Sequence, residues 1–248
     1  MKQHVTIQCP VCQTEIERDI VTRIDTRHDT AEKQQLLEGT LFSFECNHCG
    51  AKRQIDHDFM YLDRDLKVVV CLIPNLETRK AEMEEILTQF MRQSTEDLSQ
   101  YSLRVVRTAA TLVEKVTIFN EGLNDIVVEI VKLLTDGLFA KEHPEIEVHA
   151  RYFYNHQGQS KLLYLTKHDQ MLVDFHQSLV DFSEDKYHKA VREDYKGRFI
   201  VVDEHWAANL LENKPGDAVN ELEEKLTPDQ PSPLDQRRIQ KALKKKKR

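Results

Sequence analysis

Two Cys-x-x-Cys pairs near the N-terminus constrain this chain more than any other feature. They occupy residues 9–12 (Cys-Pro-Val-Cys) and 46–49 (Cys-Asn-His-Cys), with 33 residues between Cys12 and Cys46. Each pair follows a strand-like segment and can form a tight turn that points both sulfurs at one ion. Four thiolates suit a closed tetrahedral zinc shell. The sequence therefore predicts one structural Zn²⁺ per chain, with the ligands Cys9, Cys12, Cys46 and Cys49.

Two other uses of these cysteines stay open. A Cys-x-x-Cys pair can serve thiol–disulfide chemistry, but redox folds place it at the start of a helix, and neither pair here precedes a convincing helix. Four cysteines can also hold an iron–sulfur cluster. His48 lies inside the second pair and is expected to be exposed rather than a ligand. The fifth cysteine, Cys71, lies in the most apolar segment and is expected to be buried.

The composition is that of a soluble globular protein. Hydrophobic residues make up 40% and charged residues 31% of the 248, with only 7 Gly and 7 Pro. No apolar run is long enough to cross a membrane, and the N-terminus lacks the apolar core of a signal peptide. We therefore expect a cytoplasmic protein, where two cysteine pairs indicate metal binding before disulfides.

Charge is distributed unevenly along the chain. The formal net charge is −7, and residues 236–248 carry eight Lys or Arg and no acid, so the remaining residues sum to −15. Residues 1–75 contain 9 Lys or Arg against 12 Asp or Glu. An acidic body disfavours binding to nucleic acid outside the basic tail.

The pattern of elements predicts an α+β fold, with an N-terminal zinc-ribbon-like β domain followed by a mixed α/β region. We expect a zinc-ribbon-like part over 1–75, a helical continuation over 76–140, a C-terminal α+β region over 141–212 and a disordered, basic-ended tail over 213–248. A ribbon of short strands buries little apolar surface. Residues 1–75 are therefore expected to depend on the metal more than the rest does.

Strands are predicted as two short segments within 3–23 and over 66–73, 101–107, 147–155, 161–166, 171–176 and 198–203. The 66–73 segment is continuously apolar and should be buried on both faces. Helices are predicted over 29–37, 78–93, 110–120, 125–139, 183–195 and 206–211, with Asn124 and Ser183 as caps. The apolar stripe of the 78–93 helix is expected to pack in the core. It consists of Met83, Ile86, Leu87, Phe90 and Met91.

No catalytic motif is apparent in the sequence. The strongest polar cluster of the second half comprises Asp203, Glu204 and His205 before Trp206, and it is typical of a strand-to-helix junction where an acid caps the helix. The two helices around 122–124 could form a helix-turn-helix, but Asp125, Glu129 and Asp136 make the second helix unsuitable for facing phosphates.

Beyond the cysteine pairs, segments at 41–50, 60–63, 67–72, 103–106 and 112–125 follow in an order that resembles the CpXC domain family of bacteria and archaea. The resemblance covers about residues 3–130. It implies a zinc-ribbon-like domain in the cytoplasm and supplies no substrate. This chain departs from the family pattern with Gln13 in place of Gly, Asn47 in place of Pro and Leu62 in place of His.

Three functional hypotheses remain. The leading one is a non-enzymatic, zinc-stabilised module that acts through another protein. The alternative is a nucleic-acid-binding zinc ribbon that uses its basic tail. The third is an enzyme whose site lies in residues 143–206, using Asp203, Glu204 or His205. Oligomeric state and partner identity are not encoded in any pattern we find.

Overall fold

The computed structural model describes residues 1–192 and 195–212, so the tail predicted over 213–248 lies outside the described residues. The described residues form two compact units. We call residues 1–121 with 195–201 the N-terminal unit, and residues 122–192 with 202–212 the C-terminal unit. Both combine helices with sheets, and the protein is α+β, as the sequence predicts.

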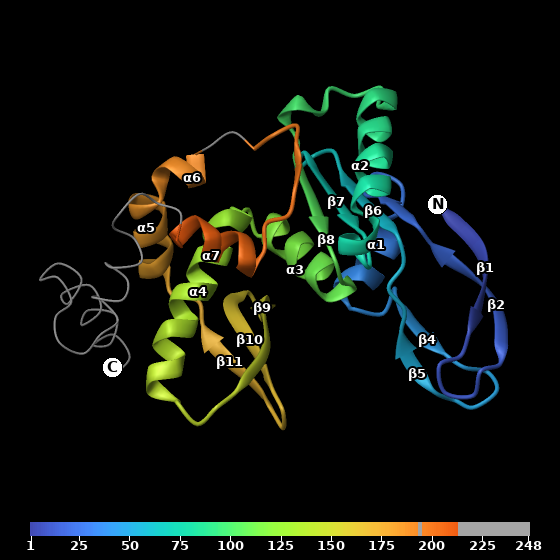
Figure 1. Cartoon of the computed structure of the whole chain (residues 1–248), viewed down its shortest axis with the longest axis horizontal. Coiled ribbons are helices and arrows are strands. Elements are labelled where there is room, and N and C mark those ends of the chain that lie inside the picture. Colours follow the sequence, from blue (N-terminus) through green and yellow to red (C-terminus); the bar gives the residue numbers. More distant parts are fainter. Residues whose placement is uncertain (193–194, 213–248) are drawn as a thin grey trace, which may run out of the picture. The chain divides into compact units, whose positions relative to one another are not determined.

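The N-terminal unit begins with a ribbon of two hairpins (Figure 1). Strands β1 (Lys2–Gln8) and β2 (Glu15–Val21) pair antiparallel, and the first cysteine pair lies at their turn. Strands β4 (Ser43–Glu45) and β5 (Lys52–Gln54) form the second hairpin around the second cysteine pair. Helix α1 (Thr30–Leu37) lies between the hairpins in sequence. The predicted pair of strands within 3–23 is confirmed.

A five-stranded sheet follows, in the order β12-β8-β7-β6-β3. Its members are β3 (Arg23–Asp25), β6 (Phe59–Asp63), β7 (Val68–Leu72), β8 (Ser102–Val106) and β12 (Phe199–Ile200). Strands β6 and β7 are antiparallel, whereas β7 and β8 are parallel and joined through helix α2 (Leu76–Gln93). Helix α3 (Ala109–Asn120) follows β8.

Strand β7 divides the core of this unit into two layers, because its residues alternate between the faces of the sheet. Val68, Val70 and Leu72 pack with residues of α1 and α3, and Val69 and Cys71 pack on the other face with residues of α2. All five residues of β7 are buried. The predicted burial of this strand on both faces is confirmed, and so is the burial of Cys71, which is 4% exposed.

Two predictions in this unit are wrong in part. Ile86 is 44% exposed, because the stripe of α2 that faces the sheet is narrower than the apolar pattern and rests on Met83, Leu87 and Phe90. The strand predicted over 198–203 is reduced to β12, a short edge strand that pairs with β8 at Phe199 and Ile200 only.

The C-terminal unit packs helices on a three-stranded antiparallel sheet of order β11-β10-β9. The strands are β9 (Val148–His156), β10 (Gln159–Thr166) and β11 (Gln170–Asp174). Gln157 and Gly158 both have positive φ, as a two-residue hairpin turn requires. Helix α4 (Asp125–Glu142) is capped by Asn124, whose side chain accepts from the Ile126 amide at 3.0 Å, so that predicted cap is confirmed.

The helix predicted over 183–195 with Ser183 as its cap is wrong. Helix α5 spans Gln177–Lys186 and a separate short helix, α6, spans His188–Arg192. Ser183 lies fully buried within α5, where its hydroxyl donates to the Leu179 carbonyl at 2.7 Å. Val180 and Ser183 are three residues apart and lie on the same, buried face of α5. Ser183 therefore belongs to the interior of the helix and not to its start. Helix α7 (Glu204–Glu212) follows.

Candidate metal centre

The two hairpins of the ribbon bring four sulfur atoms together. The Sγ atoms of Cys9, Cys12, Cys46 and Cys49 all lie within 4.8 Å of one another. Cys9 and Cys49 are 3.8 Å apart, and Cys12 and Cys46 are 3.6 Å apart. A disulfide would require about 2.05 Å. A tetrahedral ion with metal–sulfur bonds of about 2.3 Å would separate its sulfurs by about 3.8 Å. The four cysteines could therefore hold one metal ion.

The two cysteine turns have the same backbone hydrogen bonds. Gln13 N donates to Cys9 O at 2.8 Å, and Gly50 N donates to Cys46 O at the same distance. One residue further, the carbonyls of Thr14 and Ala51 accept from Cys9 N and Cys46 N, both at 2.9 Å. Gln13 and Gly50 thus occupy equivalent positions, with φ of 59° and 70°. Both turns require the left-handed conformation, which glycine adopts without strain and glutamine does not.

This equivalence predicts opposite effects for two substitutions. Gln13→Gly should stabilise the ribbon by about 0.5–1 kcal/mol, because it removes left-handed strain from the first turn. Gly50→Ala should destabilise it by about 1–2 kcal/mol, although an added Cβ there meets nothing within 4 Å. Thermal unfolding of the metal-loaded protein measures both changes. A lower melting temperature for Gln13→Gly than for wild type would contradict the left-handed strain assigned to Gln13.

Hydrogen bonds within the first turn lower the pKa of Cys9 and Cys12. Cys12 Sγ lies 3.4 Å from the Thr14 hydroxyl, and hydrogen bonds from the side chain and backbone of Thr14 lower the pKa of Cys12 to about 5. Backbone N–H groups of Cys12 and Val11 lower the pKa of Cys9. At Cys49 the Ala51 amide acts the same way, but desolvation and the neighbouring sulfurs outweigh it and raise the pKa to about 12. Burial and the neighbouring sulfurs thus keep the proton on Cys49, and the positive charge of a bound dication would favour its release.

The apolar core around the four sulfurs is small. Among the residues that the structure describes, buried Cys9, Phe44 and Cys46 are flanked only by the partly buried residues Cys12, Ile16, Ala51 and Ile55. His48 is exposed, as predicted. So few apolar contacts contribute little free energy to folding of the ribbon. A bound ion would have to supply most of the free energy that keeps it folded.

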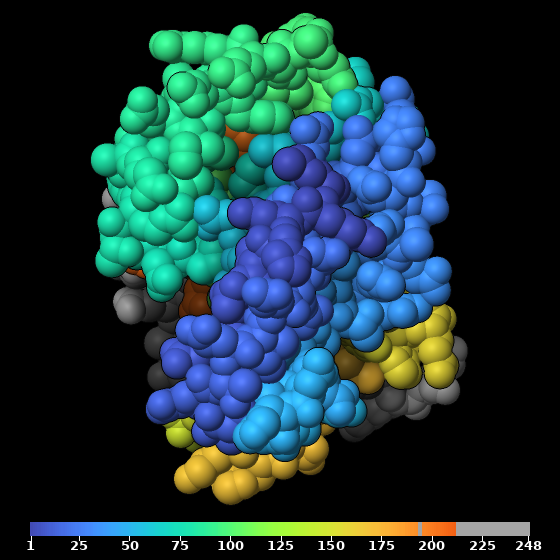
Figure 2. Space-filling view, turned by 90° about the vertical axis from the view of Figure 1, so that its right-hand side faces the viewer, coloured from blue at the N-terminus to red at the C-terminus, as the bar shows by residue number. Residues whose placement is uncertain are grey.

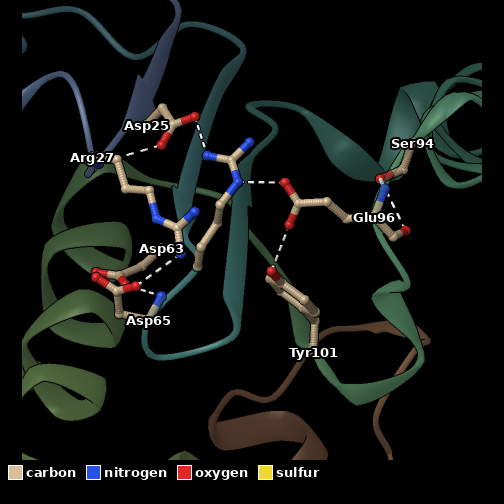
Figure 3. A network of polar contacts seen from close by, with 8 residues as sticks. Asp25, Arg27, Asp63, Asp65, Ser94, Glu96 and Tyr101 are labelled. Carbon is tan, nitrogen blue, oxygen red and sulfur yellow. Dashed lines mark hydrogen bonds and ion pairs between the residues drawn. The ribbon is translucent and has the colours of Figure 1, made fainter.

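A second polar cluster lies at one end of the five-stranded sheet, and sequence reasoning missed it (Figure 3). Arg64 bridges Asp25 of β3 and Glu96 of the segment before β8. The Tyr101 hydroxyl donates to the other oxygen of Glu96 at 2.7 Å. The hydrogen bonds from Tyr101 and Arg64 lower the pKa of Glu96. We call Asp25, Arg64, Glu96 and Tyr101 the arginine network.

Asp63 lies next to this network and is 3% exposed. Its carboxylate accepts from Tyr61 OH and Lys33 Nζ, both at 3.1 Å, and from the backbone amides of Asp65 and Leu66 at 3.1 and 3.0 Å. Burial alone would raise the pKa of Asp63, but the hydrogen bonds from Leu66 and Lys33 outweigh it and lower the pKa. The side chain is fully engaged in holding the β6–β7 turn.

Asp63→Asn should destabilise the protein by about 2 kcal/mol at pH 7, because an amide presents a donor to groups that already donate. A lowered folded pKa adds stability above the unfolded-chain value of about 4, and this stability is lost as pH falls through the folded pKa. The difference between wild type and variant should therefore shrink at pH 3. Urea unfolding at pH 7 and pH 3 measures it, and a difference that is constant with pH would contradict the role of the ionised carboxylate.

In the C-terminal unit, two of the three residues suggested for an enzyme site make structural contacts. Asp203 Oδ1 accepts from the Trp206 amide at 2.9 Å and caps α7, which is the capping role that the sequence favours. Glu204 pairs at 2.8 Å with Arg151, which also pairs with Asp136 of α4. The Tyr164 hydroxyl donates to Asp136 at 2.6 Å. These contacts connect α7 and α4 to the sheet. His205 is exposed.

Comparison with known proteins identifies the family of the chain. No curated protein and no solved structure matches it. No helix within residues 1–192 and 195–212 is long and apolar enough to cross a membrane. The family model described as CpXC protein matches residues 7–132, about half of the chain, including all four clustered cysteines and strands β2 to β8. The chain therefore belongs to the CpXC family.

Proposed function

We propose that this protein is a non-enzymatic, zinc-stabilised module that acts by binding another protein. The observation that carries the proposal is the group of four sulfurs within 4.8 Å of one another. Four thiolates fill a tetrahedral shell and leave no position for water or substrate, which suits a structural ion better than a catalytic one. Soft thiolate ligands favour zinc over magnesium or calcium, which prefer oxygen.

Surface features of the ribbon support a role in binding. Val11 lies at the tip of the first cysteine turn and is 54% exposed. The outward face of β2 presents Glu15, Glu17 and Asp19, all exposed. An apolar tip beside acidic side chains fits a protein partner with a basic rim better than it fits phosphates.

The partner is tested by affinity purification with three matched baits: wild type, Val11→Ser and Cys12→Ser. We expect a protein that is recovered with wild type, is reduced with Val11→Ser and is lost with Cys12→Ser. That protein must then bind purified, metal-loaded wild type in a titration with both components defined. Equal recovery by the Cys12→Ser bait would show that the ribbon is not the binding element.

The eight basic residues of 236–248 favour a second candidate, nucleic-acid binding through the tail. Such binding should be non-specific and weaken steeply with salt, because it depends on counterion release. Deleting 236–248 should abolish it. Affinity that survives the deletion would mean that the acidic body binds nucleic acid, against the charge argument.

A further inference from the structure

The inward face of the β1–β2 hairpin contains a charged side chain, Arg18, in a row of half-buried residues. The strict alternation of β2 places Arg18 on the same half-buried face as Ile16 and Ile20. Arg18 stands opposite Val5 across the hairpin. Figure 2 shows the N-terminal hairpin in dark blue along the surface of the molecule. The aliphatic stem of Arg18 can pack along this apolar row while its guanidinium stays open to solvent and to an external partner.

Arg18 has few contacts with the protein. Its guanidinium lies 5.6 Å from the centre of the Phe44 ring, and Nη1 is 3.5 Å from the Ser43 carbonyl, the limit of a hydrogen bond. Within the described residues no carboxylate is at ion-pair distance from it. A guanidinium has five N–H donors in a planar fork, so most of them are left for another acceptor.

A cavity of about 230 Å³ is lined in part by Arg18. Its apolar wall comes from Ile7, Ile20, Phe42 and Phe44, and its polar lining includes Lys2, Gln35 and Ser43 besides Arg18. This space suits a ligand of small metabolite size.

The charged groups of the lining that could bind a ligand are cationic. Lys2 is exposed and only 3.9 Å from Glu32, a weak pair. Asp19 is an acid in the lining, and its carboxylate is occupied by His4 Nδ1 at 2.9 Å. The side-chain amide of Gln35 makes no hydrogen bond with the part of the chain that the structure describes. The cavity therefore offers donors and cationic groups together with an apolar wall.

We propose that this cavity binds a small organic anion, with its carboxylate or phosphate group on the Arg18 fork and its apolar body against the half-buried side chains of Ile7 and Ile20. The fork matches two oxygens of one oxyanion, and charge-assisted bidentate pairs are about twice as strong as neutral hydrogen bonds. The site lies between the two hairpins of the ribbon and adds a ligand to the module proposed above.

The test is an NMR titration of the full, metal-loaded chain with inorganic phosphate, acetate and benzoate, against chloride at equal ionic strength. Localised shifts are expected at the Arg18 Nε–Hε group and at the amides of Ser43 and Phe44. Benzoate should bind at least about threefold more tightly than acetate, because its ring adds contact with the apolar side chains of Ile7 and Ile20. Phosphate binding tighter than both carboxylates would assign the head group as phosphate. Absence of localised shifts with all three anions, or the same shifts with chloride, overturns the proposal.

Two variants assign the binding to Arg18. Arg18→Gln should weaken the bound anion about tenfold or more, and Arg18→Lys should weaken it less, because lysine keeps the charge but not the fork. Arg53→Gln is the matched control, since Arg53 is an exposed arginine of β5 outside the cavity lining and its loss should change nothing. Metal content is measured for each sample, so a failed ribbon is distinguished from a failed anion site. Unchanged affinity in metal-loaded Arg18→Gln or Arg18→Lys contradicts the assignment.

Discussion

Replacing Cys46 with serine is expected to release the metal and unfold the ribbon. Cys46 is 2% exposed and lies among the few apolar residues of the ribbon core. Structural zinc contributes on the order of 10 kcal/mol to such small domains, far more than this core can supply. Amide hydrogen exchange should show loss of protection in β1, β2, β4 and β5. The five-stranded sheet has its own two core layers and should stay protected.

The matched control for this variant is Cys71→Ala. Cys71 is also buried, at 4% exposure, but it belongs to β7 and not to the sulfur cluster. Its pKa is raised to about 12 by burial, as expected of a neutral thiol in an apolar layer. Cys71→Ala should keep the metal and cost about 1–2 kcal/mol through a small cavity. A Cys46→Ser protein with a fully protected ribbon would show that the ion is not required for folding.

Replacing Arg64 with methionine is expected to lower the free energy of unfolding by about 3 kcal/mol. Side-chain exposures of Arg64, Asp25 and Glu96 are 20%, 17% and 31%, so the two carboxylates would lose their cation in a partly buried place. Removing one partner of such a pair leaves uncompensated charge. The segment before β8 should also loosen, because Glu96 connects it to β3 through Arg64.

An exposed arginine provides the comparison. Arg79 also bridges two carboxylates, Asp58 and Glu82, but these are 49% and 58% exposed. Arg79→Met should cost less than about 1 kcal/mol, since water replaces an exposed pair at little cost. Chemical unfolding of both variants at pH 7 measures the contrast. Equal losses would mean that burial does not set the strength of the arginine network.

The sequence was most informative where local pattern and chemistry coincide. The cysteine spacing identified four residues that the structure brings together, and the apolar run of β7 correctly indicated burial on both faces. Asn124 and Asp203 cap the helices that follow them, because capping depends on the next few residues only. The Ser183 prediction failed because α5 begins six residues earlier, at Gln177, and Val180 and Ser183 both lie on its buried face.

Long-range contacts could not be read in the same way. Asp25 and Arg64 are 39 positions apart, and Arg64 and Glu96 are 32 apart. No local periodicity links them, and a three-residue strand such as β3 has too few residues to show one. The inward position of Arg18 follows from the alternation of β2, but the cavity beside it depends on α1 and β4, which only the folded chain brings near.

The structural zinc site is tested by the metal content of the purified wild-type protein, measured by elemental analysis together with a thiol count. We expect about one zinc per chain, with Cys9, Cys12, Cys46 and Cys49 protected from a thiol reagent until a chelator is added. A protein without metal, in which Cys9 and Cys12 cycle between thiol and disulfide, would contradict a structural zinc site and make redox chemistry the better account of the cysteine pairs.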